Sequence, residues 1–293
     1  MSEQTSAPEG ETIALRCMEI WGGNRAVEQS VSVPGIDVHV VSRPHGGDES
    51  GGDIYYVSQC GAGNIARIAL ADVAGHGVGV SELSSTLQGL MRKHINTADM
   101  TRLARALNTE FDAISRHGRF ATAILATYWA PTDHLILVNA GHPPPLRYRA
   151  GADEWSFVDH EEASASEIGV ANLPLGVIEP TSFGQIAIPL GRGDVVILYT
   201  DALVEAAGAD GRMLGQDGLL ELARRLDARD RASLGDRLRT MVRETRGGKD
   251  SGDDETIVVL AHNGSDPPRH TLGETLGMLG RMLGLTTSVR EAG

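Results

Sequence analysis

Alternation of apolar and polar residues predicts β-strands along much of the chain. Between residues 36 and 40, Ile and Val alternate with Asp and His, which is the period of a strand with one buried face. Other strand-like runs lie at 54–57, 65–71, 121–128, 135–139, 183–188, 195–199 and 257–260. Gly61 and Gly63 lie between the runs at 54–57 and 65–71, so we expect a hairpin there.

The hydrophobic period changes to 3.6 residues in two regions, and each region predicts a pair of helices. The first pair is marked by Leu83, Leu87, Leu90 and Met91 and then by Leu103, Leu107 and Ile114. The second is marked by Leu219, Leu222 and Leu226 and then by Leu234, Leu238 and Met241. Because strands group with strands and helices come in pairs, we expect an α+β fold of antiparallel sheets with helices layered on them.

The same pattern divides the chain into a lead, one domain and a tail. Residues 1–11 are polar and are expected to be a disordered lead, and the domain is predicted over residues 12–263. In the tail, residues 264–293, Leu272, Leu276, Leu279 and Leu283 share one face of a possible amphipathic helix, with glycines beside them. This helix could dock on the domain, on a partner or on a second copy to form a homodimer, and a frayed tail is the alternative.

Composition excludes several classes of function. The 293 residues carry a formal net charge of −13 with 4% aromatic residues, so binding of nucleic acid is not expected. No apolar run approaches the roughly 20 residues that cross a bilayer, and the polar N-terminus has no apolar signal core, so we expect no membrane association and a cytoplasmic location. Two cysteines are too few for a disulfide framework.

Candidate chemistry lies where predicted strands meet turns. Asp53 and Asp72 stand at the start and end of strand-like runs, and Asp201 and Asp253 flank two others. Converging carboxylates repel one another unless hard cations such as Mg²⁺ or Mn²⁺ neutralise them. For any one of these aspartates alone, a turn or cap role is the more common explanation, because Asp favours such positions. Spacing alone does not show whether the four meet in space.

Six sequence blocks occur in an order that resembles the metal-dependent protein phosphatases of the PPM family, in their bacterial SpoIIE/RsbU-like branch. The blocks are GGDIY at 51–55, ADVAGHG at 71–77, NAGHPPP at 139–145, LPLGV at 173–177, GDVVILYTD at 193–201 with EA at 205–206, and DDET at 253–256. The blocks lie between residues 51 and 256, and the resemblance covers residues from about 34 to 262. A single such block would be weak, but the ordered set is highly specific.

The resemblance implies a four-layer α-β-β-α sandwich, with two antiparallel sheets flanked by helices, and a site for two Mn²⁺ or Mg²⁺ ions at one end. By position, Asp72 would bridge both ions and the carbonyl of Val73 would bind one of them. Asp201 and Asp253 would complete the other ion's ligands, and Asp53 would hold metal-bound water directly or indirectly. Residues expected next to these ligands are Gly75, His76 and Asp254.

The resemblance further implies a protein serine/threonine phosphatase that uses metal-activated water. Its expected partner is a phosphoprotein such as an anti-sigma-factor antagonist. Two alternatives stay open: a catalytically silent module of the same fold that binds a partner, and a small-molecule phosphomonoesterase. Presence of all four carboxylates counts against the silent module, because clustered buried charge is costly to keep.

Overall fold

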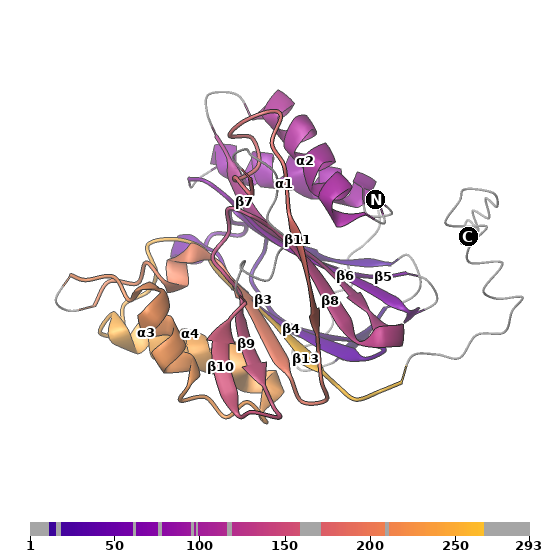
Figure 1. The fold of residues 1–293 in the computed structure, drawn as a ribbon. Coiled ribbons are helices and arrows are strands. Elements are labelled where there is room, and N and C mark those ends of the chain that lie inside the picture. Colours follow the sequence, from indigo (N-terminus) through magenta and orange to yellow (C-terminus); the bar gives the residue numbers. More distant parts are fainter. Residues whose placement is uncertain are drawn as a thin grey trace, which may run out of the picture.

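The computed structural model contains two β-sheets stacked face to face, with one pair of helices outside each sheet (Figure 1). The residues that it describes are 12–15, 19–60, 63–75, 78–94, 97, 99–115, 119–158, 171–208 and 211–266. The predicted lead, His76 and residues 267–293 of the predicted tail lie outside these ranges. Within them, no helix is long and apolar enough to span a membrane.

One sheet has six strands, and all of its neighbouring pairs are antiparallel. Its order is β11 (Gln185–Pro189), β8 (His134–Ala140), β7 (Ala121–Trp129), β6 (Ile65–Val73), β5 (Asp53–Cys60) and β2 (Ile20–Gly23). Helices α1 (Val78–His94) and α2 (Met100–Ile114) cover its outer face (Figure 1).

The other sheet has seven strands, and α3 (Gly215–Ala223) and α4 (Leu234–Thr245) cover its outer face. Its order is β1 (Thr12–Ala14), β3 (Val27–Val33), β4 (Ile36–Arg43), β13 (Glu255–His262), β12 (Val195–Tyr199), β9 (Leu146–Arg149) and β10 (Glu154–Phe157). The four-layer α+β prediction is therefore confirmed.

The sheets are antiparallel as expected, except at one edge, where β1 runs parallel to β3. The chain passes through β2 in the other sheet between these two strands, so no hairpin forces them to run in opposite directions. Strands β1, β2, β3, β9 and β10 were not predicted. Strands β2, β9 and β10 are only four residues long, so apolar and polar positions repeat too few times to give a clear strand signal. Strands β9 and β10 form a hairpin at the edge of the sheet.

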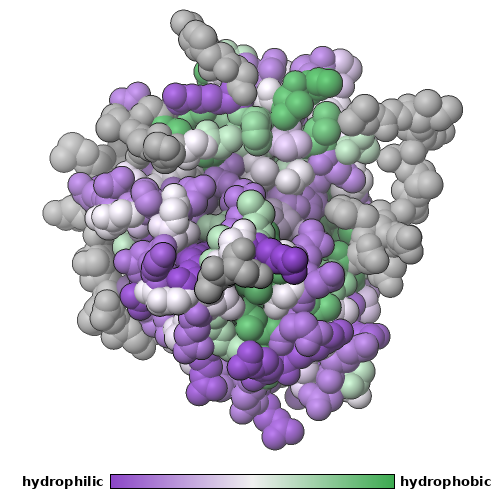
Figure 2. All heavy atoms as spheres, turned by 90° about the vertical axis from the view of Figure 1, so that its left-hand side faces the viewer, coloured by the Kyte–Doolittle hydropathy of each residue, from purple (hydrophilic) through white to green (hydrophobic). Residues whose placement is uncertain are grey.

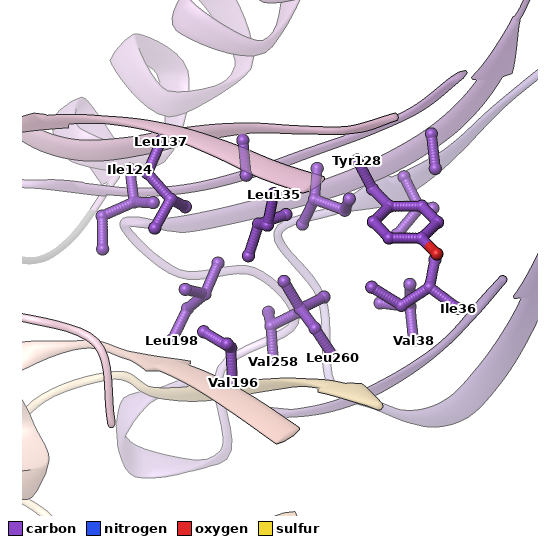
Figure 3. Close-up of a cluster of buried hydrophobic side chains, with 14 of the residues drawn as sticks. Ile36, Val38, Ile124, Tyr128, Leu135, Leu137, Val196, Leu198, Val258 and Leu260 are labelled. Carbon is purple, nitrogen blue, oxygen red and sulfur yellow. The ribbon is translucent and has the colours of Figure 1, made fainter. Parts of the chain in front are cut away.

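The main hydrophobic core lies between the two sheets (Figure 3). In the six-stranded sheet, the buried side chains that face the other sheet include Ile124, Tyr128, Leu135 and Leu137. Burying one Leu or Ile side chain stabilises the folded state by about 1.5–3 kcal/mol. The facing side chains include Ile36, Val38, Val196, Leu198, Val258 and Leu260. Because successive side chains of a strand alternate between faces, residues two positions further along each strand continue this inner layer.

Candidate metal centre

The candidate site contains Asp53 and Asp72, which lie directly opposite each other on β5 and β6. Asp53 is two residues from Tyr55 and Asp72 is two residues from Leu70, and both of these neighbours belong to the core between the sheets. Strand alternation therefore places the two carboxylates on the inner face, at one end of that core. Asp53 is almost fully buried, with 2% of its surface exposed.

Hydroxyl groups of the opposite sheet meet Asp53 at this end. Thr200, which follows β12, donates a hydrogen bond from Oγ1 to Asp53 Oδ2 at 3.0 Å. The same Oγ1 accepts a hydrogen bond from the main-chain N–H of Thr256 at 3.0 Å. Ser42 Oγ on β4 lies 2.9 Å from Thr256 Oγ1. A buried polar layer thus closes the hydrophobic core where the carboxylates begin.

Asp201 and Glu205 bring two further acids to the site. Asp201 opens a short 3₁₀-helix, Asp201–Leu203, and the main-chain N–H of Glu205 donates to the carbonyl of Asp201 at 2.9 Å. The two residues are therefore one helical turn apart, and their side chains can share a face. Burial raises the pKa of Asp201, and the negative charges of Glu205 and Asp253 raise it further.

Asp254 and Asp253 precede β13 and have different surroundings. The buried carboxylate of Asp254 accepts hydrogen bonds from the main-chain N–H groups of Gly52 at 2.5 Å and His45 at 2.6 Å. A Cβ atom on Gly51 would lie 2.5 Å from this carboxylate, so the loop before Asp53 requires glycine there. The side chain of Asp253 is exposed and accepts a hydrogen bond from the N–H of Asp254 at 2.9 Å.

The clustered acids disfavour their own ionisation. Burial, followed by repulsion from Asp201, Asp253, Asp254 and Glu205, raises the pKa of Asp72 to about 8. Burial also raises the pKa of Asp53, with Asp72 as the next cause, while the Thr200 and Thr256 side chains favour its charged form. The four charges that raise the pKa of Asp72 are all negative, and a divalent cation would relieve their repulsion.

The donor set fits hard divalent cations. Asp53 Oδ1 is buried and makes no hydrogen bond within the described part of the chain. A second candidate metal ligand is the carbonyl oxygen of Val73. A Cβ atom on Gly52 would lie 3.0 Å from this oxygen, so the carbonyl faces the loop that precedes Asp53. Among the described residues, no three His, Cys, Asp or Glu side chains approach closely enough to hold one ion by themselves. Mg²⁺ commonly binds one or two carboxylates and keeps several waters, which suits this arrangement.

A buried histidine continues the polar layer. Thr122 on β7 lies directly opposite Asp72, and its Oγ1 is 2.7 Å from Nδ1 of His142. The side chain of Asn139 binds the main chain of His142. It accepts a hydrogen bond from the N–H of His142 at 2.8 Å and donates one to the carbonyl of His142 at 2.9 Å. Burial lowers the pKa of His142 to about 3, and contact with the main chain of Tyr199 opposes this shift. His142 is therefore neutral at ordinary pH.

The structure thus brings Asp53, Asp72, Asp201, Asp253 and Asp254 to one end of the sandwich. Residues Val73 and Gly75 follow Asp72 directly, and Gly75 takes a positive φ of 109° in the turn after β6.

Glu205, Thr200 and Thr256 were not among the site residues predicted from the sequence. Glu205 had a usable signal, because it follows Asp201 at helical i, i+4 spacing. The signal for the two threonines was weaker. Thr200 and Thr256 each lie two residues from a core-facing residue of β12 or β13, and so continue the inward-facing positions of the strand.

The family model for Stage II sporulation protein E (SpoIIE) matches residues 63–263. A curated relative, the phosphoserine phosphatase RsbP of Bacillus subtilis, is 24% identical over 173 residues, which cover 57% of this chain and 40% of the relative. The chain therefore spans less than half of that relative's length.

Solved structures share the fold. The RsbU and RsbW domains of a Mycobacterium tuberculosis protein align with a TM-score of 0.68 and 24% identity, over 89% of this chain and 71% of that one. The PP2C phosphatase domain of Bacillus subtilis SpoIIE, with a fragment of its regulatory domain, aligns with a TM-score of 0.64 and 21% identity, over 77% and 63%. The catalytic domain of the phosphatase PstP, solved with two manganese ions, aligns at 0.53 and 17% over 77% and 97%.

Proposed function

The chain belongs to the SpoIIE family, and on that basis we propose that it is a metal-dependent protein serine/threonine phosphatase. The observation that carries the proposal is the group of mutually repelling carboxylates around Asp72 at the end of the inter-sheet core. The name of the relative RsbP, a phosphoserine phosphatase, supports the same reaction. The PP2C-type neighbours support the fold on which that reaction would take place.

The site would hold two Mn²⁺ or Mg²⁺ ions, and Asp72 would be a ligand of both. The other ligands would be Asp53, Asp201, Asp253 and the carbonyl oxygen of Val73. When bound, such ions lower the pKa of a coordinated water and neutralise charge on a phosphoryl group. The PstP structure with two manganese ions supports this choice of metal for the fold.

The chain's own groups hold this ligand set in place. Thr200 fixes the orientation of Asp53 through Oδ2, and Oδ1 makes no hydrogen bond within the described residues, so it would be available to a cation. Asp254 ties the main chain at Gly52 and thereby positions Asp53, the next residue. Glu205 adds negative charge beside Asp201, which strengthens the attraction for cations.

The substrate that we propose is phosphoserine or phosphothreonine on a small bacterial regulatory protein, such as an anti-sigma-factor antagonist. Resemblance to the RsbU-like branch supports this choice, together with the fold likeness to a protein that contains RsbU and RsbW domains. An acidic site without metal would repel the phosphate dianion, so substrate binding is expected to require the ions.

The test measures phosphate release from p-nitrophenyl phosphate and from a phosphoserine peptide, with Mn²⁺, with Mg²⁺ and with EDTA. We expect metal-dependent turnover that falls at least 100-fold in Asp72→Asn and Asp201→Asn. Asp217→Asn is the matched control, because Asp217 is an exposed acid in the first turn of α3. Unchanged turnover in both site variants would contradict the proposal.

The two alternatives give different results in the same experiment. A silent binding module would bind Mn²⁺ by calorimetry and release no phosphate from either compound. A small-molecule phosphomonoesterase would act on small phosphoesters and leave phosphoserine peptides intact.

A further inference from the structure

Exposed hydrophobic side chains gather at the same end of the molecule as the candidate metal centre. Among the described residues, the exposed large hydrophobics are Ile114, Phe120, Trp129, Val177, Ile178 and Met213. Four of these, Ile114, Phe120, Val177 and Ile178, lie around the start of β7 and the end of α2, and we call them the apolar rim. Figure 2 looks onto this end, the left-hand side of Figure 1, and hydrophobic residues reach the surface in its upper part.

Hydrogen bonds connect the apolar rim to the metal centre. The carbonyl of Phe120 accepts a hydrogen bond from the N–H of Ala74 at 3.0 Å, and Ala74 is two residues from Asp72. The next residue, Ala121, exchanges main-chain hydrogen bonds with Leu175 at 2.7 and 3.0 Å. The segment that carries Val177 is therefore attached to the strand that neighbours Asp72.

Helix α2 fixes the remaining part of the rim. The side chain of Asn108 is buried, accepts from the N–H of Gly176 at 2.9 Å and donates to the carbonyl of Ile178 at 3.0 Å. A Cβ atom on Gly176 would lie 2.9 Å from the Phe111 ring, so the segment packs closely against α2. Ile178 is half exposed, at 50%, on this fixed backbone. The rim is thus a supported surface that presents apolar side chains to water.

Charge explains why such a surface is useful beside this site. Asp53 and Asp72 lie opposite each other at the metal centre, and the chain carries a net charge of −13. Bound cations would attract a phosphoryl group on any molecule alike, so they cannot distinguish one phosphoprotein from another. Contiguous exposed apolar side chains are typical of protein interaction sites. Selection of a protein substrate would then depend on contacts outside the ions.

We propose that the apolar rim is the docking surface for the phosphoprotein substrate, and that this partner carries apolar side chains beside its phosphorylated serine or threonine. The inference rests on the proposed phosphatase function. Each of the four rim side chains is only 37–50% exposed, so together they offer much less apolar area than the roughly 800 Å² per partner that a stable interface buries. The rim therefore suits a transient enzyme–substrate contact better than a permanent dimer. Its position next to Asp72 would also make a permanent partner obstruct the site.

The test uses two phosphoserine peptides that differ only in the residues flanking phosphoserine, Leu and Phe in one and Ser in the other. For the unaltered protein with Mn²⁺, we expect kcat/KM to be about tenfold or more higher for the apolar peptide, mainly through KM. Phe120→Ser and Ile178→Ser are expected to abolish this preference and to leave turnover of p-nitrophenyl phosphate unchanged. Trp129→Ser is the matched control, because Trp129 is similarly exposed, at 38%, at the opposite end of β7.

Three results would overturn the inference. Equal kcat/KM for both peptides, or a preference retained in both rim variants, would show that the rim does not select substrate. A decrease of molecular mass by light scattering in Phe120→Ser would show that a second copy occupies the rim. Failure of Mn²⁺-dependent p-nitrophenyl phosphate turnover would instead count against the proposed function. Anisotropy of the same peptides labelled with fluorescein then still tests the rim through binding.

Discussion

Thr200 donates a hydrogen bond to Asp53 across 3.0 Å, and this contact joins the two sheets at the end that carries the clustered acids. The Thr200 hydroxyl also accepts a hydrogen bond from the main-chain N–H of Thr256. One hydroxyl group therefore pairs a buried N–H of its own sheet and orients a carboxylate of the other sheet. Both side chains lie on inward-facing positions of the core between the sheets. The position of Asp53 therefore depends on how the sheets stack.

We expect Thr200→Val to weaken Mn²⁺ binding by about 10- to 100-fold, the usual effect of removing a group that orients a ligand. It would also leave the buried N–H of Thr256 without an acceptor, at a cost of about 1–3 kcal/mol in the free energy of unfolding. Calorimetric titration with Mn²⁺ and urea denaturation measure the two effects. Thr200→Ser keeps the hydroxyl and is expected to behave like the unaltered protein. Equal Mn²⁺ affinity in the valine variant would contradict this role.

In metal-free protein, the contribution of Asp72 to stability is expected to fall as pH rises from about 4 to about 8. The pKa of Asp72 is raised to about 8, whereas an unfolded Asp ionises near 3.9. Between these values the folded state binds more protons than the unfolded state, so the free energy of unfolding falls with pH. The contribution is fully present below pH 4 and is lost above pH 8.

Asp72→Asn removes this titration, and we expect the variant in EDTA at pH 8 to be more stable than the unaltered protein by about 1–3 kcal/mol. Thermal melts at pH 5, 6, 7 and 8 in EDTA measure the change. Excess Mn²⁺ is expected to stabilise the unaltered protein and to have little effect on the variant. Identical pH slopes for the two proteins would argue against repulsion at Asp72.

The adjacent acids Asp253 and Asp254 are expected to respond differently to the same substitution. Asp254→Asn replaces one of two acceptor oxygens by an amide NH₂, which faces the N–H of Gly52 or His45, so we expect a loss of about 1–3 kcal/mol in stability. Asp253 is exposed, and Asp253→Asn is expected to change the stability of metal-free protein by less than about 0.5 kcal/mol.

For metal affinity we expect the opposite order, with a larger effect of Asp253→Asn than of Asp254→Asn. Asp253 is a proposed metal ligand, whereas Asp254 supports the loop that precedes Asp53. Mn²⁺ titration of Asp253→Asn is expected to show loss of one binding event. If Asp254→Asn left stability unchanged while Asp253→Asn unfolded the protein, the assignment of these roles would be reversed.

His142 gives a pH dependence of opposite sign. Its pKa is lowered to about 3 in the folded protein, against about 6.5 when unfolded, so below pH 6.5 the unfolded state binds the extra proton. Stability from neutral His142 is therefore present above pH 6.5 and is lost as pH falls toward 3.

We expect the destabilisation caused by His142→Gln to be smaller at pH 4.5 than at pH 7.5, by about 2 kcal/mol, because the unaltered protein has by then lost this contribution. Urea denaturation of both proteins at the two pH values measures the difference, and the carboxylate titrations largely cancel in the comparison. A pH-independent difference would show that the ring is not held neutral by burial.

Sequence alone was sufficient where a segment has a strong hydrophobic period. The strand Val195–Tyr199 was predicted at its observed bounds, and both helix pairs were found because their apolar residues repeat every three or four positions. Strand β3 was missed although Val and polar residues alternate within it. The parallel pairing of β1 with β3 carries no local signal, since it depends on the path of the chain through the other sheet.

For the site, sequence determined which residue types stand at strand ends and in what order, because both are properties of the chain itself. Tertiary structure decided that Asp53 faces Asp72, that hydroxyls of the opposite sheet meet Asp53, and that Glu205 joins the acids. It also separated the buried Asp254, which binds main-chain N–H groups, from the exposed Asp253. The physical reason is that burial, repulsion and hydrogen bonding between residues up to about 200 positions apart exist only once the two sheets are stacked.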